Sequence, residues 1–168
     1  MKRKAILAAL LLCCVCAVSQ AAPARWWPAW EQSTTQKPEH VVQAIQYLLR
    51  ARGYNVAADG IYGKKTANAV RDFQRRRKIV RSGKMNNATW EALVVTIKPG
   101  SRGNAVRAAQ MMLRHADYDI PLDGVFGRAT KDAVVKFQRV RGKTRDGIIG
   151  LNTWCELVEG TVGEPQGD

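Results

Sequence analysis

The residue types that most often carry catalysis are scarce in this chain of 168 residues. It has two histidines, His40 and His115, and four cysteines, of which only Cys155 lies beyond residue 22. These groups are too few to form a Ser/His/Asp or Cys/His catalytic arrangement, and their spacing is not that of metal ligands. Paired carboxylates for glycoside cleavage would have to be Asp59 and Asp123, and both stand in Asp-Gly turn signals. The sequence therefore predicts no enzymatic activity, no metal site and no cofactor.

The N-terminal residues have the three-part pattern of a secretory signal peptide. Basic residues at 2–4 precede an apolar run over 5–18, and small residues follow at 19–24. The run is shorter than the roughly 20 residues that span a bilayer. We therefore expect cleavage near residues 21–24, export to a periplasm, a cell wall or the medium, and no stable membrane insertion afterwards. A retained anchor and a lipoprotein are the alternatives.

The chain carries a formal charge of +13 at pH 7, which favours a polyanionic partner. Cell-wall polymers, anionic lipid and nucleic acid all fit this description. The basic run Arg75–Lys78 would bind DNA non-specifically, with a steep salt dependence. Because the signal segment directs the chain out of the cytoplasm, we expect no specific nucleic-acid partner. A structural or protein-interaction module is the other alternative.

Two copies of one sequence unit make up most of the chain. A shift of 64 residues aligns residues 40–94 with 104–158 without a gap, and 22 of the 55 positions are identical. Such self-similarity indicates one small domain used twice. The predicted organisation is a signal peptide (1–22), a Trp-rich segment (23–39), a first repeat (40–95), a second repeat (99–158) and a tail (159–168).

Each repeat is predicted to contain three short helices, so the expected fold class is all-α. Val42, Ile45 and Leu49 recur at helical spacing, and Gly53 follows as a stop signal. The expected helices lie near 41–52, 64–77, 87–95, 105–116, 128–141 and 151–158. Because domains of this size bury little surface, most of their apolar residues should be core. The largest of these are Phe73, Trp90, Phe137 and Trp154.

An ordered string of motifs accompanies these helices. In the second copy it runs Asp123-Gly124, Phe126-Gly127, Thr130, Ala133-Val134, Phe137-Gln138, Asp146-Gly147, Gly150 and Thr153-Trp154. The string resembles the small three-helix peptidoglycan-binding domain that is found appended to bacterial cell-wall hydrolases. The resemblance covers roughly residues 40–158. It implies two tandem three-helix domains that bind peptidoglycan without catalysis, with a cell-wall hydrolase as a possible partner in trans.

The first copy departs from this pattern. It has Ser82-Gly83 in place of the second Asp-Gly, and Asn86 in place of a glycine. Asn86 remains a good N-cap for the third helix. Lys78 stands where a glycine usually ends the second helix, so we expect the basic run to extend that helix by a turn. These departures predict weaker ligand binding by the first copy.

The resemblance implies a ligand with sugars, amides and carboxylates, which calls for hydrogen-bond donors, cations and an aromatic floor. A groove between the turns and the end of the second helix would supply them. The candidate ligand-binding residues are Tyr54, Tyr62, Gln74, Arg75, Tyr118, Phe126, Gln138 and Arg139. For the glutamines the alternative is binding of loop backbone, and for the arginines it is a solvated face. For the tyrosines and Phe126 the alternative is a core position.

A second set of motif residues is assigned to structure. These residues are Asp59, Gly60, Gly63, Thr66, Asp123, Gly124, Gly127, Thr130, Asp146 and Gly147. Asp59 and Asp123 should order their turns and cap the second helix of each repeat. The glycines at 60, 63, 124 and 127 should supply backbone angles that other residues avoid. The similar loops at 123–130 and 146–153 should lie side by side.

Three tryptophans, Trp26, Trp27 and Trp30, crowd the segment before the first repeat. They could stack on sugar rings or rest at a membrane surface. Packing onto the first repeat is the alternative.

Overall fold

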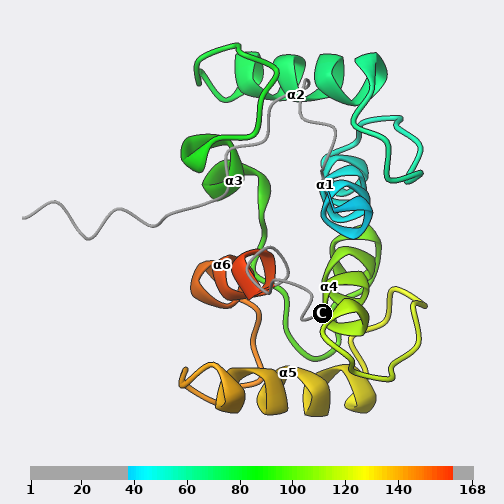
Figure 1. Cartoon of the computed structure of the whole chain (residues 1–168), viewed down its shortest axis with the longest axis vertical. Helices are drawn as coiled ribbons and strands as arrows, with labels where there is room; N and C mark the ends of the chain where they lie inside the picture. The colour runs from blue at the N-terminus through cyan, green and yellow to red at the C-terminus, as the bar shows by residue number, and fades with distance from the viewer. Residues whose placement is uncertain (1–37, 161–168) are drawn as a thin grey trace, which may run out of the picture.

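The computed structural model describes residues 38–160, and this part of the chain is all-α, as predicted (Figure 1). Its six helices are α1 (Glu39–Ala51), α2 (Lys64–Arg76), α3 (Asn87–Leu93), α4 (Asn104–His115), α5 (Arg128–Val140) and α6 (Leu151–Gly160). Every helix begins and ends within about two residues of its predicted bounds. The predicted signal peptide, the three tryptophans at 26–30 and the tail beyond residue 160 lie outside the described residues.

The two repeats pack together through their first helices. α1 and α4 make the most extensive contact between helices, and Figure 1 places them between α2 and α5, which lie at opposite ends. α1 is buried on two sides, because Ala44 and Leu48 are as inaccessible as the residues that face its own repeat. In α4 the equivalent positions are Ala108 and Met112, which are also fully buried. The small alanines allow a close approach, and the two repeats share one hydrophobic core.

The segment between the repeats is held by both loops of the second repeat. Ile97 and Ile149 exchange backbone hydrogen bonds of 2.9 and 3.1 Å. Phe126 donates its backbone N–H to the carbonyl of Ser101 at 2.9 Å. The indole of Trp154 donates to the carbonyl of Val95 at 2.7 Å. The two similar loops therefore both bind the segment between the repeats, and Phe126 and Ile149 are buried.

The predicted extension of α2 by the basic run is wrong. α2 ends at Arg76, and Lys78 adopts a left-handed backbone with φ 57°, like Gly142 at the equivalent place with φ 63°. The N–H of Ile79 closes this turn by donating to the carbonyl of Gln74 at 2.9 Å. Lysine thus takes a conformation that glycine adopts at less cost. The turn that reverses the chain after α2 requires a left-handed backbone at Lys78, although lysine by itself disfavours that conformation.

The beginnings of the helices correct two further expectations. Gly63 and Gly127 are the N-caps of α2 and α5, in extended conformations that any residue can adopt, so they do not supply special angles. The turn aspartates before them do not cap these helices. Asn86 does cap α3, because its side chain accepts the N–H of Thr89 at 2.9 Å. The left-handed angles belong to the glycine of each Asp-Gly pair, with φ 75° at both Gly60 and Gly124.

Replacing these two kinds of glycine by serine should have opposite effects. At Gly124 a new Cβ would lie 3.1 Å from the Gly103 carbonyl oxygen in a left-handed backbone, so Gly124→Ser should lose about 2 kcal/mol of unfolding free energy. At Gly127 the Cβ meets nothing within 4 Å. Gly127→Ser should gain a few tenths of a kcal/mol, about the usual difference between these N-caps. Urea unfolding of both variants tests this, and equal destabilisation would contradict it.

The contact between α1 and α4 includes a pair of stacked histidines. His40 in the first turn of α1 and His115 in the last turn of α4 have ring centroids 3.3 Å apart and planes 16° apart. Burial, with a smaller contribution from the charge of His115, lowers the pKa of His40 to about 4. Its Nε2 atom is buried without a hydrogen-bond partner among residues 38–160. The folded protein therefore resists protonation of this ring.

Acid should accordingly destabilise the junction between the repeats. Between pH 6.5 and about 4 the unfolded chain binds a proton at His40 that the folded chain does not, so stability falls as the pH falls. Since His40 is only half-buried, we expect a loss of about 1 to 2 kcal/mol. His40→Phe keeps an aromatic ring without the proton. Thermal unfolding from pH 7 to 4.5 should show a flatter dependence in this variant, and an unchanged slope would refute the assignment.

Candidate functional site

Each repeat contains two loops that are fastened from within by a buried glutamine. In all four, the side-chain amide donates to a backbone carbonyl of the loop and to a threonine hydroxyl, and its oxygen accepts a glycine N–H. The glutamines are Gln46, Gln74, Gln110 and Gln138, and none is more than 2% exposed. The threonines are Thr66, Thr89, Thr130 and Thr153, and the glycines are Gly60, Gly83, Gly124 and Gly147. We call this arrangement the glutamine clasp.

The clasp of Gln110 shows the geometry. Its Nε2 donates to the Val125 carbonyl at 3.1 Å, to the Thr130 hydroxyl at 3.1 Å and to the Asp123 carboxylate at 2.8 Å. Its Oε1 accepts the N–H of Gly124 at 2.8 Å. Asp123 also accepts the Val125 N–H at 2.8 Å. The hydrogen bond from the Val125 N–H, followed by that from Gln110, holds the pKa of Asp123 below its ordinary value. The hydrogen bonds from the Ile61 N–H and from Gln46 lower the pKa of Asp59 in the same way.

The clasp accounts for the geometry of several residues that the sequence placed in a binding groove. Gln74 donates to the Lys84 carbonyl and the Thr89 hydroxyl, each at 2.9 Å, and Gln138 does the equivalent in the second repeat. Both amides therefore face inwards and have protein partners. The alternative interpretation, that they bind loop backbone, describes what they do in the fold.

The two aromatic residues beside the first turns are also buried. Phe126 is 1% exposed and Tyr62 is 7% exposed. The Tyr62 hydroxyl donates to the Gly83 carbonyl at 3.0 Å, and burial raises its pKa above the ordinary range. Neither ring lines a groove in this conformation. Both rings instead contribute to the core. The turns beside them are rich in glycine and supply few other side chains to fill it.

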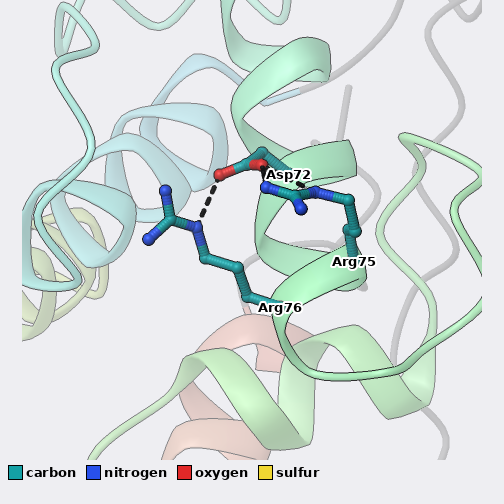
Figure 2. A network of polar contacts seen from close by, with 3 residues as sticks. All are labelled: Asp72, Arg75 and Arg76. Carbon is teal, nitrogen blue, oxygen red and sulfur yellow. Dashed lines mark hydrogen bonds and ion pairs between the residues drawn. The ribbon is translucent and has the colours of Figure 1, made fainter.

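The remaining candidates lie at the surface or at its edge. Tyr54 and Tyr118 are half-buried and meet Phe73 and Phe137, respectively, edge to face. Arg75 and Arg76 share the carboxylate of Asp72, at 2.6 and 2.7 Å (Figure 2). The two guanidinium groups hold the pKa of Asp72 down to about 2. Arg139, the counterpart of Arg75, is exposed.

An open pocket of about 400 Å³ lies over the loop that joins α5 to α6 in the second repeat. It is lined by Gln138, Lys143, Thr144, Asp146, Ile148, Gly150, Leu151, Asn152 and Thr153. The clasp of Gln138 forms its base, and Lys143, Thr144 and Asn152 stand exposed around it. Lys143 pairs with Glu156 at 2.6 Å, which raises the pKa of its ammonium group. The pocket thus offers donors, a carboxylate and two aliphatic side chains to a polar ligand.

The equivalent surface of the first repeat is chemically different. Ser82, Asn86 and Ala88 replace Asp146, Gly150 and Asn152. Ile79 replaces Lys143. Two of the departures seen in the sequence of the first copy, Ser82 and Asn86, therefore fall on positions that line this pocket, whereas that of Lys78 does not. Sequence reasoning did not place Lys143, Thr144 or Asn152 at a common surface, because nothing in their spacing shows that the fold brings them together.

The described residues contain no group of three or more histidine, cysteine and acidic side chains suited to a metal ion. Within the same part of the chain, no helix has the length and hydropathy needed to cross a membrane.

Comparison with known proteins identifies the family. Residues 39–93 and 102–157 match the family described as "Putative peptidoglycan binding domain". These two segments make up most of the chain, and the chain belongs to this family. The tandem copies inferred from the motif string are thereby confirmed.

Relatives of this chain include enzymes of cell-wall chemistry. N-acetylmuramoyl-L-alanine amidase CwlL of Bacillus licheniformis is 32% identical over 126 residues, which cover 69% of this chain and 34% of that enzyme. Zinc D-Ala-D-Ala carboxypeptidase of Streptomyces albus G is 40% identical over 76 residues, which cover 42% of this chain and 28% of that enzyme. This chain therefore spans about a third or less of these enzymes' lengths.

A solved structure is also similar. It is a peptidoglycan-binding protein from Clostridioides difficile in complex with glutamine hydroxamate, 43% identical, with a TM-score of 0.40. The similarity covers 40% of this chain and 43% of that one.

Proposed function

We propose that this chain is an exported, non-catalytic protein that binds peptidoglycan through its two repeats. The observation that carries the proposal is the family membership of both repeats, which together account for nearly all described residues. Export rests on the signal-like N-terminus, and the absence of catalysis rests on the scarcity of catalytic residue types in the sequence. A cell-wall hydrolase acting in trans would supply the chemistry that these repeats do not.

The open pocket of the second repeat is the proposed ligand site. Peptidoglycan presents amides, hydroxyls and carboxylates, and the pocket combines the ammonium of Lys143 with the polar groups of Thr144 and Asn152. Ile148 and Leu151 add apolar surface against which the methyl groups of a peptide stem can pack. The base is rigid because the Gln138 clasp fixes the loop at four hydrogen bonds. A preformed pocket loses little entropy when it binds.

Retention on purified sacculi freed of teichoic acid tests the proposal. We expect the protein to stay bound at about 0.5 M salt, where the attraction between exposed charges is strongly screened. The double variant Thr144→Ala/Asn152→Ala should bind at least fivefold more weakly, since both side chains line the pocket. Asn55→Ala, an exposed residue of the first repeat, is the matched control and should bind normally.

Two outcomes would count against this function. Release of the unmodified protein by modest salt, together with equal retention on DNA, would mean that its positive charge explains the binding. If binding resists salt and is equally strong in the double variant, the protein binds peptidoglycan, but the pocket of the second repeat is not the binding site.

A further inference from the structure

A second pocket opens on the first repeat, where the chain leaves α1 and where α2 ends. It has a volume of about 270 Å³ and is lined by Arg52, Tyr54, Phe73, Arg76 and Arg77. Two aromatic rings and three guanidinium groups thus surround one small concavity. We call it the arginine pocket.

The rings form a floor with cations placed over it. Tyr54 and Phe73 meet edge to face, with centroids 6.3 Å apart. The guanidinium carbon of Arg76 lies 5.7 Å from the Tyr54 centroid, and that of Arg77 lies 5.6 Å from the Phe73 centroid. Stacking on a ring restricts a long side chain, so these guanidinium groups are partly preorganised.

The positive charge of the pocket is poorly compensated within residues 38–160. No carboxylate lines it, and Asp72, which binds the Nε of Arg76, is shared with Arg75 (Figure 2). Arg77 has no ion-pair partner among the described residues. Arg52 uses Nε and Nη2 to donate to the carbonyls of Ala92, Leu93 and Val94, which leaves its Nη1 hydrogens without a described acceptor.

The electrostatics agree with this geometry. Burial lowers the pKa of Arg52, and the charge of Arg77 lowers it further. The two guanidinium groups therefore repel each other across a partly desolvated space. An anion in that space would relieve the repulsion and accept hydrogen bonds from groups that now face solvent.

The second repeat provides a natural comparison. Tyr118 and Phe137 form the same edge-to-face pair at 6.4 Å, and Arg141 lies 5.6 Å from the Phe137 centroid, like Arg77 over Phe73. The other two arginines are missing, because Ala116 and Val140 occupy their positions. The aromatic floor is therefore common to both repeats, whereas the cluster of three arginines occurs only in the first.

We propose that the arginine pocket binds the carboxylate end of a short peptide, of the kind that a peptidoglycan stem presents. A guanidinium fork matches a carboxylate in two parallel hydrogen bonds, and the aromatic floor suits a small apolar side chain next to it. The size of the pocket fits a terminal residue rather than a long polymer track. This inference rests on the proposed function, and it gives a separate role to the first repeat, whose residues differ from those that line the polar pocket of the second.

The test is a titration of the whole protein with N-acetyl-alanyl-alanine, followed by ¹H–¹⁵N NMR of the backbone and of arginine Nε–H groups. We expect saturable shifts at Tyr54, Arg76 and Arg77 with the free acid and none with its C-terminal amide. Arg76→Val, which copies the second repeat, should weaken binding at least fivefold. Arg141→Ala, the matched control, should leave it unchanged.

Each other outcome would overturn the inference. Equal shifts with the amide would show that the carboxylate is not read. Tighter binding of inorganic phosphate than of the peptide acid would assign the pocket to a phosphate-bearing polymer. Equal weakening by the control would indicate diffuse charge. The titration uses no sacculi, so the inference can fail while the protein still binds peptidoglycan, and sacculus binding can fail while the pocket still binds the peptide.

Discussion

Replacing Ala108 by aspartate is expected to unfold both repeats together, with a loss of about 4 kcal/mol or more. Ala108 is completely buried in α4, the helix that packs most extensively against α1. A carboxylate there would be desolvated without a partner, and its size would separate two helices whose approach depends on small residues. Each repeat alone has a core too small to be more than marginally stable. Losing their contact should therefore remove the stability of both.

Urea unfolding followed by tryptophan fluorescence and circular dichroism measures this effect. The unmodified protein should show one cooperative transition for both repeats, and the variant should be largely unfolded or have a much lower midpoint. Ala129→Asp is the matched control, because Ala129 is exposed in the first turn of α5, where a negative charge is tolerated or favourable. A variant that unfolds in two separate steps, with one repeat unaffected, would show that the repeats are independent.

Replacing Gln110 by alanine should be the next most damaging change, with a loss of about 3 kcal/mol. The substitution removes four hydrogen bonds. It leaves the Gly124 N–H without a buried partner, and it leaves the Val125 carbonyl and the Thr130 hydroxyl with only their mutual hydrogen bond of 3.4 Å. Unsatisfied buried groups cost more than the hydrogen bonds themselves contribute. The left-handed turn at Gly124 would also lose the contact that fixes it.

The melting temperature should fall by roughly 10 °C for Gln110→Ala, given the size of the folded region. Gln43→Ala is the control, since Gln43 is partly exposed and makes a single 3.5 Å hydrogen bond to Glu39. It should change the free energy of unfolding by about 0.5 kcal/mol or less. Since alanine favours a helix at least as much as glutamine does, helix propensity cannot explain a loss. If both glutamine variants lost stability equally, the clasp would not be its source, because Gln43 has no part in one.

Much of the local structure could be read from individual residues. The spacing of Val42, Ile45 and Leu49 located α1, and Gly53 marked its end, where φ is 89°. Asn86 identified the cap of α3. These features depend on contacts within a few residues, so the sequence carries them directly. Lys78 shows the limit, because its left-handed backbone follows from the path that the chain must take and not from its own preference.

The candidate site was less accessible to this reasoning. The repetition of Asp-Gly with a threonine seven residues after the aspartate is visible at Asp59, Asp123 and Asp146, and it marks the loops that the clasps hold. It does not reveal that a distant glutamine joins them, since the Gln110 and Asp123 side chains lie 13 positions apart in sequence. For Tyr62 and Phe126 the sequence leaves both a groove position and a core position open, because an aromatic residue beside a turn can face either way. Only the packing around it decides the direction.

The sequence by itself determined the helices, their turns, the duplication and the family, because these follow from short-range spacing and from an ordered motif string. The tertiary structure alone decided that α1 and α4 join the repeats into one core, and that each repeat offers a different pocket. Both outcomes depend on side chains far apart in the chain, such as those of α1 and α4, or Arg52 with Arg76 and Arg77. The proximity of such groups is set by how the helices pack, which no local pattern encodes.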